Sequence, residues 1–304
     1  MRKTSIIVSI LIVTMLLGGC GTLPTPTDAI YEFTSSGVDP DSWVVVPAGE
    51  FVKGQFELDG FVENDYEIMV TEVTNTQYAK YLSEALAAGT IKINESNQVL
   101  GFYPGDENTG GKHEYEVPAQ DYVHMSLDDP ASRISYDGSV FTVKEGYENH
   151  PVAMVSFFGA WSYAEFYGYR LPTENEWEKA ARGEDNRAFP WGEEVGHHYL
   201  NYYHSEDPFE TVEKYSDTSP VGFYNGNTYG DFYTEDAVSP YGLYDMAGNV
   251  GEWTLDKIDG YHYRRIRGGN KAFYEIDSRV WKFDSADPKY VSPNVGFRCV
   301  RDVQ

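Results

Sequence analysis

The spacing of apolar and polar residues predicts three short helices separated by short extended runs. Gln77 and Glu176 lie three residues after a threonine, which is the spacing of a capping box at the start of a helix. The remaining sequence is divided by Gly, Pro, Asn and Asp into runs such as 43–47. The helix signals are the N-terminal caps Thr74, Ser156 and Thr173 and the terminating glycines Gly89, Gly168 and Gly183.

Residues 90–149 show no strong periodicity. Alternating apolar and polar residues at 139–143 predict a hairpin there. We expect this segment to be an excursion from the core of a domain that covers 43–304. Long excursions are often functional, and a plain packing appendage is the alternative.

The N-terminus has the pattern of an export signal. Arg2 and Lys3 precede an apolar run over 6–17, interrupted only by Ser9 and Thr14. A helix over this run rises only about 18 Å, which is too short to cross a bilayer, so a signal peptide is favoured over a membrane span.

The end of this run resembles a bacterial lipobox, with the sequence LGGC over 17–20. The resemblance implies a signal peptide over 1–19, cleavage before Cys20 and lipidation of its thiol. An ordinary secretory signal with an incidental cysteine is the alternative. Residues 20–42 mix Pro, Thr, Ser, Asp and Gly, and we interpret them as a flexible tether.

Composition then narrows the classes of function. The chain of 304 residues carries 23 Lys and Arg against 48 Asp and Glu, a net charge of −25. This balance argues against a nucleic-acid partner, which requires a basic face, and against adsorption to an anionic membrane surface. Cys299 is the only cysteine besides Cys20. An exported chain without a disulfide must be held by its core, and metal ions are a further source of stability.

Several phrases in the second half are more specific than composition. They are RLPTENEWEKAARG (170–183), FPWG (189–192), YGLYDMAGNVGEWT (241–254), RGG (267–269) and VGFRCV (295–300). In this order they resemble the formylglycine-generating enzyme, or sulfatase-modifying factor, family. The resemblance covers about 43–302. It implies an α+β domain with the family's variant of the C-type lectin-like fold, in which regular secondary structure is sparse.

The stretch from Asp245 to Glu252 has the composition of a calcium loop. Calcium prefers six to eight hard oxygens from carboxylates, carbonyls and water, and a short loop with a glycine supplies several of them. The resemblance implies that calcium binds the Asp245 and Glu252 side chains and the carbonyls of Gly248 and Val250. The alternative is that the acids only cap turns. A second, looser set implied by the family is Asn201, the Tyr202 carbonyl, Glu213 and the Tyr215 carbonyl.

The sequence departs from the family where its oxidising members place their chemistry. Those enzymes have a serine after the two glycines and two downstream cysteines that bind copper(I). Here Asn270 occupies the serine position, and Phe273 and Ser278 occupy the cysteine positions. Copper(I) requires soft thiolates, which neither a phenyl ring nor a hydroxyl can replace. Copper and formylglycine formation are therefore not expected, and no catalytic residue is assigned.

The same region combines basic and aromatic side chains, the types that concentrate binding energy at interfaces. Local positive charge in a strongly acidic protein would select acidic ligands. The alternative is that about half of these residues belong to the core. The candidate binding residues are Tyr261, Tyr263, Arg264, Arg265, Phe273, Tyr274 and Trp281.

Two functions remain open. The first is a calcium-stabilised binding or scaffold module, tethered by its lipid to the outer membrane or cell surface and facing a protein or glycan ligand of the cell envelope. The second is an oxidoreductase or protein-modifying enzyme of the same family that uses a different active centre. Enzymatic activity stays undecided at this point, and the missing cysteine pair favours the first.

Overall fold

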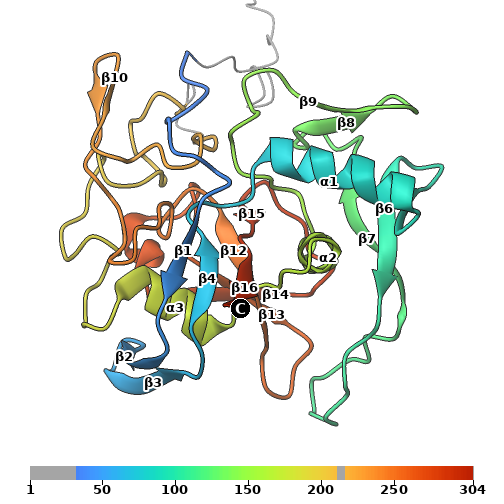
Figure 1. Ribbon diagram of the computed structural model, residues 1–304, viewed down its shortest axis with the longest axis horizontal. Helices are drawn as coiled ribbons and strands as arrows, with labels where there is room; N and C mark the ends of the chain where they lie inside the picture. Colours follow the sequence, from blue (N-terminus) through green and yellow to red (C-terminus); the bar gives the residue numbers. More distant parts are fainter. Residues whose placement is uncertain (1–31, 211–215, 304) are drawn as a thin grey trace, which may run out of the picture.

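The computed structural model describes residues 32–210 and 216–303, and Figure 1 shows their arrangement. The predicted signal peptide, Cys20 with the first part of the tether, Glu213 and Tyr215 lie outside the described residues. Helices α1 (Asn75–Ala88), α2 (Phe157–Phe166), α3 (Glu174–Arg182) and the 3-10 helix η2 (Glu275–Ser278) are separated by short strands.

The strands of the first half are β1 (Trp43–Val46), β2 (Gly49–Lys53), β3 (Leu58–Val62), β4 (Tyr66–Met69), β5 (Ile91–Ile93), β6 (Gln98–Tyr103), β7 (Gln120–Ser126), β8 (Ile134–Tyr136) and β9 (Phe141–Val143). Those of the second half are β10 (Thr228–Tyr229), β11 (Phe232–Tyr233), β12 (Gly251–Lys257), β13 (Arg264–Arg267), β14 (Phe283–Ala286), β15 (Val295–Gly296) and β16 (Val300–Asp302). The predicted α+β architecture with short elements is confirmed.

Two small sheets occupy the middle of the molecule (Figure 1). In the first, β4 lies between β1 and β16, so the two ends of the described chain are joined in one sheet. The second has the order β14-β13-β12-β15, in which β12 and β15 are parallel and the other pairs antiparallel. Helix α3 lies on one side of these sheets, and α1 and α2 lie on the other with β5–β7 (Figure 1).

The three predicted helices are confirmed together with their caps. The Thr74 hydroxyl accepts a hydrogen bond from the Gln77 amide, and the Gln77 side chain accepts one from the Thr74 amide. Thr173 and Glu176 form the same capping box at α3, and Ser156 caps α2. Gly89 ends α1 with a φ of 74°, a left-handed conformation that glycine adopts without a steric cost.

The segment 90–149 differs from the expectation of an excursion. Its predicted hairpin is present as β8 and β9, but β5, β6 and β7 add a three-stranded sheet. Val99 and Met125 from this sheet are fully buried in the same hydrophobic cluster as α1 and α2. The segment is therefore part of the core, because its strands cover the apolar faces of two helices.

No helix among the described residues is both long and apolar enough to cross a membrane.

Candidate functional site

The candidate site is formed by two loops that flank the β12–β13 pair. The first loop, 245–252, leads into β12, and the second, 268–278, follows β13. The Gly248 amide donates to the Gly268 carbonyl, and the Lys271 amide donates to the Asn249 carbonyl, each over 2.9 Å. These backbone hydrogen bonds place the predicted calcium loop directly against the loop that contains Asn270, Phe273 and Ser278.

Below the first loop lies a buried ion pair between Glu252 and Arg298. The Arg298 Nη2 and Nε atoms each lie 2.8 Å from an oxygen of Glu252, and neither side chain is exposed. Trp177 on α3 donates its indole N–H to Glu252 Oε2 over 2.8 Å. Arg298 also donates to the carbonyls of Met69 and Tyr244. The pair thus ties the C-terminal segment to β4 and to the loop.

Two more carboxylates are buried beside this pair. Asp245 accepts a hydrogen bond of 2.6 Å from the Gly222 amide, and burial raises its pKa to about 6. Glu72 accepts hydrogen bonds from the Asn249 side chain and the Val250 amide. Burial, with a smaller contribution from Asp245 and Glu252, holds the pKa of Glu72 well above its ordinary value.

Three buried carboxyl groups therefore lie around one guanidinium, and burial disfavours the ionised forms of Asp245 and Glu72. Among the described residues, no group of three or more His, Cys, Asp or Glu side chains is arranged to hold a metal ion by itself. A cation at this loop would need backbone oxygens as well, as the predicted carbonyls of Gly248 and Val250 would provide. The predicted set of Asp245, Gly248, Val250 and Glu252 fits calcium in donor type, and the Glu252 oxygens already accept hydrogen bonds from Arg298 and Trp177.

The second predicted calcium set is only partly described. Asn201 is buried, its side-chain oxygen accepts from Ser216 and its amide donates to the Asp217 carbonyl. The Asn201 carbonyl accepts the Asn249 amide over 2.8 Å. A Cβ atom on Gly248 would lie 2.4 Å from this carbonyl oxygen, so the contact between the two loops requires glycine. The contribution of Tyr202 stays a prediction.

The second loop contains a cavity of about 230 Å³ between η2, β13 and β14. Ser278 is fully buried directly behind its lining, and a Cβ on Gly269 would lie 2.4 Å from the Ser278 hydroxyl oxygen. Asn270 and Phe273 thus line the cavity, and Ser278 lies directly behind Gly269 of the same lining. The cavity lining includes Gly269, Asn270, Phe273, Asp277, Lys282, Phe283 and Asp284.

Thiol chemistry has no evident source near this cavity. Cys299, the one cysteine in the described part of the chain, is fully buried just before β16. Burial holds the pKa of its thiol well above the ordinary value, which disfavours the reactive thiolate.

Of the two arginines in the predicted binding segment, Arg264 faces inward, which corrects its assignment as a surface binding residue, while Arg265 is partly exposed and lies over the Phe283 ring. Arg264 is only 5 % exposed, forms an ion pair with Asp106 and lies 4.3 Å from the centre of the Phe157 ring. Its charge is satisfied inside the domain because the β6–β7 connection supplies a carboxylate. Arg264 is therefore a core residue and not a surface binding residue.

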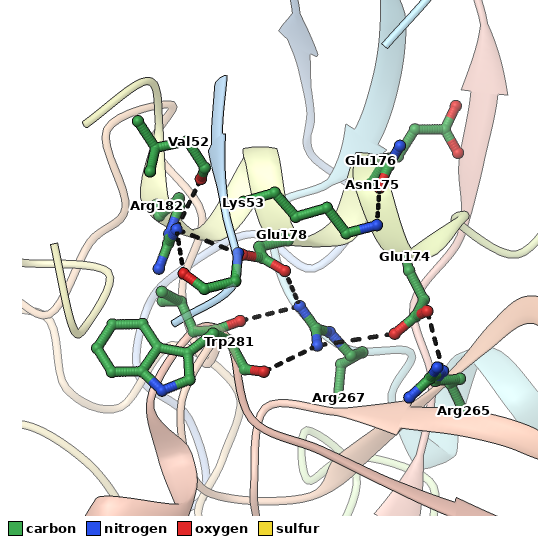
Figure 2. Close-up of polar contacts among 12 residues, drawn as sticks. Val52, Lys53, Glu174, Asn175, Glu176, Glu178, Arg182, Arg265, Arg267 and Trp281 are labelled. Atoms are coloured by element: carbon green, nitrogen blue, oxygen red, sulfur yellow. Dashed lines mark hydrogen bonds and ion pairs between the residues drawn. The ribbon is translucent and has the colours of Figure 1, made fainter. Parts of the chain in front are cut away.

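Arg265 and Arg267 belong to an ion network with α3 (Figure 2). Arg265 lies 3.0 Å from Glu174, and Arg267 lies between Glu174 and Glu178 (Figure 2). Glu178 also contacts Arg182 at 3.4 Å, so charges of opposite sign alternate along the network. These ion pairs join β13 to α3, and little positive charge is left for a ligand.

The aromatic residues of the segment divide into three groups by their neighbours. Phe273 and Tyr274 lie beside the cavity, where the Tyr274 ring packs edge-on against Tyr203. Tyr261 stacks against His113 of the β6–β7 connection and against Tyr263. Trp281 is partly buried between Arg182 and Arg279. The first group and Tyr261 with Tyr263 remain exposed enough to contact a ligand.

Comparison with known proteins adds a family to this geometry. Residues 31–303 match the family described as the Sulfatase-modifying factor enzyme 1-like domain. The chain belongs to this family. A formylglycine-generating enzyme from Thermomonospora curvata is 29 % identical to this sulfatase-modifying-factor-like chain over 229 residues, 70 % of each protein. The enzyme from Mus musculus is 26 % identical over 85 % of this chain and 74 % of its own.

Other relatives of this sulfatase-modifying-factor-like chain are larger proteins. The serine/threonine-protein kinase pkn1 of Chlamydia caviae is 34 % identical over 192 residues, which are 57 % of this chain and 27 % of the kinase. The chain spans between 27 % and 38 % of the length of the chlamydial kinases that it matches.

Solved structures confirm the fold. PvdO from Pseudomonas aeruginosa superimposes with a TM-score of 0.55 at 22 % identity, over 86 % of this chain and 94 % of PvdO. CarF gives the same TM-score at 20 % identity, over 88 % and 100 % of the two chains. Similarity at this level shows that the family fold expected from the sequence is correct.

Glu72 and Arg298 are functional candidates that the sequence analysis did not single out. A signal for Glu72 was present, since it is the one acid in the otherwise uncharged stretch 68–75, between β4 and the start of α1. A charged residue in a segment expected to be buried points to a partner inside the protein. The partners of Glu72 are more than 170 residues away in sequence, so their identity required the structure.

Proposed function

We propose that this chain is a lipid-anchored, calcium-stabilised binding module of the sulfatase-modifying factor family that does not generate formylglycine. The observation that carries the proposal is the cavity beside η2. The positions at which the oxidising relatives have their cysteines are Phe273 and Ser278 here, and the only described thiol is buried elsewhere.

The chemistry of copper supports this assignment. Copper(I) and the substrate thiol are held by sulfur in the oxidising members that the sequence resembles, and a hydroxyl is a poor ligand for this soft ion. Cys299 does not compensate, because its burial disfavours the thiolate. Oxidation of a cysteine substrate is left without a redox centre.

Binding is the activity that the same place supports. Phe273 and Phe283 line the cavity and are 37 % and 53 % exposed, and the exposed Tyr274 follows Phe273 in sequence. Asp277 and Asp284 contribute carboxylates to the lining, and Lys282, 3.6 Å from Asp277, contributes an ammonium group. Aromatic rings beside polar groups suit a protein or glycan ligand of the cell envelope. Because the nearby arginines are paired internally, the protein's net charge of −25 favours cationic groups on that ligand over acidic ones.

The remaining parts of the proposal concern location and stability. Lipidation at Cys20 would hold the domain at the outer membrane or cell surface, with the tether to residue 42 as a spacer. Calcium at the 245–252 loop would favour the ionised form of the buried Asp245 carboxyl group and would stabilise the folded state, to which it binds.

A peptide assay tests the absence of catalysis. Purified protein is given copper(I), oxygen and a cysteine peptide of the sulfatase type, and the peptide is analysed by mass spectrometry. We expect no formylglycine above the control without protein, whereas an active formylglycine-generating enzyme under the same conditions gives product. Product formation by this chain would overturn the non-catalytic assignment.

The alternative function, an enzyme of the family with a different active centre, makes a separate prediction. It requires copper or iron at stoichiometric level in protein purified without added metal. Elemental analysis that finds calcium but neither transition metal supports the binding module.

A further inference from the structure

Glu72 lies at the meeting point of segments that are distant in sequence. It is fully buried in the connection between β4 and α1. Its Oε2 atom accepts the side-chain amide of Asn249 over 2.9 Å, and its Oε1 atom accepts the Val250 amide over 3.3 Å. One carboxylate therefore holds two consecutive residues of the proposed calcium loop.

The opposite side of loop 245–252 contacts the segment that lines the cavity. The Gly248 amide donates to the Gly268 carbonyl, and the Asn249 carbonyl accepts the Lys271 amide. Gly269 and Asn270, which line the cavity, lie between these two contacts in sequence. A displacement of 248–250 would be transmitted to the cavity through two backbone hydrogen bonds.

We propose that Glu72 is a positioning residue that orients loop 245–252 for a divalent cation and, through Gly248 and Asn249, fixes the cavity lining at 268–271. The proposal rests on the calcium site of the proposed function. Glu72 holds the Asn249 side chain and the Val250 backbone amide, and in this way fixes the peptide group that joins these two residues.

Substitution of Glu72 by glutamine tests its two hydrogen bonds without a change in the size of the side chain. Glu72→Gln keeps the length of the side chain but has one oxygen, so it cannot accept both hydrogen bonds and carries no charge. We expect calcium to bind the full chain in detergent roughly tenfold more weakly, as is typical when a group that supports metal ligands is changed. Isothermal titration with calcium chloride measures this affinity.

A matched control is Asp106→Asn, which removes a carboxylate from another internal ion pair, that with Arg264. Both variants are expected to melt at a lower temperature, but Asp106→Asn should keep the calcium affinity of the wild type. Equal calcium affinities for Glu72→Gln and the wild type would overturn the metal part of the inference. If Glu72→Gln does not fold, Glu72→Asp, which keeps the charge and is shorter by one methylene, takes its place in the same measurements.

Hydrogen exchange in metal-free protein tests the positioning role independently of calcium. We expect faster exchange in Glu72→Gln for peptides that cover 248–250 and 268–271, and unchanged exchange in helix α1. Unchanged exchange in both loops would overturn the inference. Wild-type protein that binds no calcium would refute the calcium site of the proposed function, while the exchange measurement would still decide whether Glu72 positions the two loops.

Discussion

At the scale of single residues, the buried Glu252–Arg298 pair is the interaction whose loss should be most damaging. Arg298 satisfies the Glu252 carboxylate and also the carbonyls of Met69, Val70 and Tyr244. Arg298→Leu leaves a carboxylate buried without its cation and removes the guanidinium hydrogen bonds to three carbonyl groups. We expect the free energy of unfolding to fall by about 3–5 kcal/mol, measured by urea denaturation.

The control for this variant is Arg301→Leu. Arg301 pairs with Glu67 near the surface, where both side chains are about one third exposed, and such pairs contribute about 1 kcal/mol or less. A loss no larger for Arg298→Leu than for Arg301→Leu would show that the buried pair does not organise the site.

His124 makes stability depend on pH. It is fully buried on β7, and burial lowers its pKa from 6.5 to about 4. The unfolded chain binds a proton at this histidine below pH 6.5 and the folded chain does not, so stability is lost as pH falls from 6.5 towards 4. For this residue the loss between pH 7 and pH 5.5 is about 1 kcal/mol.

The measurement compares the wild type with His124→Leu across this pH range by thermal or urea unfolding. Other buried groups, such as His150 and Asp207, contribute equally to both proteins and cancel in the difference. We expect a shallower pH dependence for His124→Leu. Parallel curves would mean that His124 is not held neutral by burial.

At the scale of elements, helix α3 connects the ion network to the rest of the fold. Its capping box pairs the Thr173 hydroxyl with the Glu176 amide, and Glu176 also binds Arg170 through two hydrogen bonds of 2.6 and 2.7 Å. Thr173→Ala removes the cap alone. We expect a loss of about 1 kcal/mol in unfolding free energy, measured by urea denaturation.

A serine at position 173 provides the control, because it keeps a hydroxyl that can accept the Glu176 amide. Thr173→Ser should retain most of the stability that Thr173→Ala loses. Similar losses in both variants would mean that the methyl group, rather than the cap, is responsible.

The elements also show which parts of the structure the sequence could predict. Helices α1, α2 and α3 were predictable because their caps lie within a few residues of the turns that they stabilise. The β5–β6–β7 sheet was not, because the burial of its strands depends on contacts with α1 and α2. Local signals do not report such distant packing.

For the candidate site, too, one part could be predicted from the sequence and another part could not. The 245–252 loop and the positions of Asn270, Phe273 and Ser278 were found because each lies in one contiguous phrase. Their convergence with Glu72 and Arg298 depends on tertiary contacts across most of the chain. The inward orientation of Arg264 depends likewise on Asp106, which is 158 residues away.

At the scale of the whole molecule, attachment to a membrane is predicted to depend on Cys20. Cys20→Ala should be released into the aqueous phase in a detergent phase-separation experiment, while the wild type enters the detergent phase. The change lies outside the folded domain, so both proteins should melt at the same temperature once solubilised. Retention of the variant in the detergent phase would contradict the lipid anchor.

The last prediction concerns the sign of charge that the domain selects. The cavity lining carries two carboxylates, Asp277 and Asp284, and one ammonium group, that of Lys282, whereas Arg265 and Arg267 are paired with α3. We therefore expect an aromatic peptide with several lysines to bind, and the same peptide with glutamates in place of lysines not to bind, in fluorescence titrations at low salt. Added salt should weaken the binding, since the Debye length falls to about 10 Å at 0.1 M.

A paired substitution locates this selectivity. Asp284→Asn removes a carboxylate at the cavity, and Asp59→Asn removes an exposed one on the β2–β3 hairpin, so both variants have the same net charge. Because an exposed ion pair contributes up to about 1 kcal/mol, Asp284→Asn should weaken lysine-peptide binding about two- to fivefold while Asp59→Asn leaves it unchanged. Equal effects of the two variants would mean that the peptide responds to the overall charge of the protein. Stronger binding of the glutamate peptide would instead point to Lys282 in the cavity lining or to a positive surface elsewhere on the domain, since the arginines beside this cavity are engaged with the carboxylates of α3.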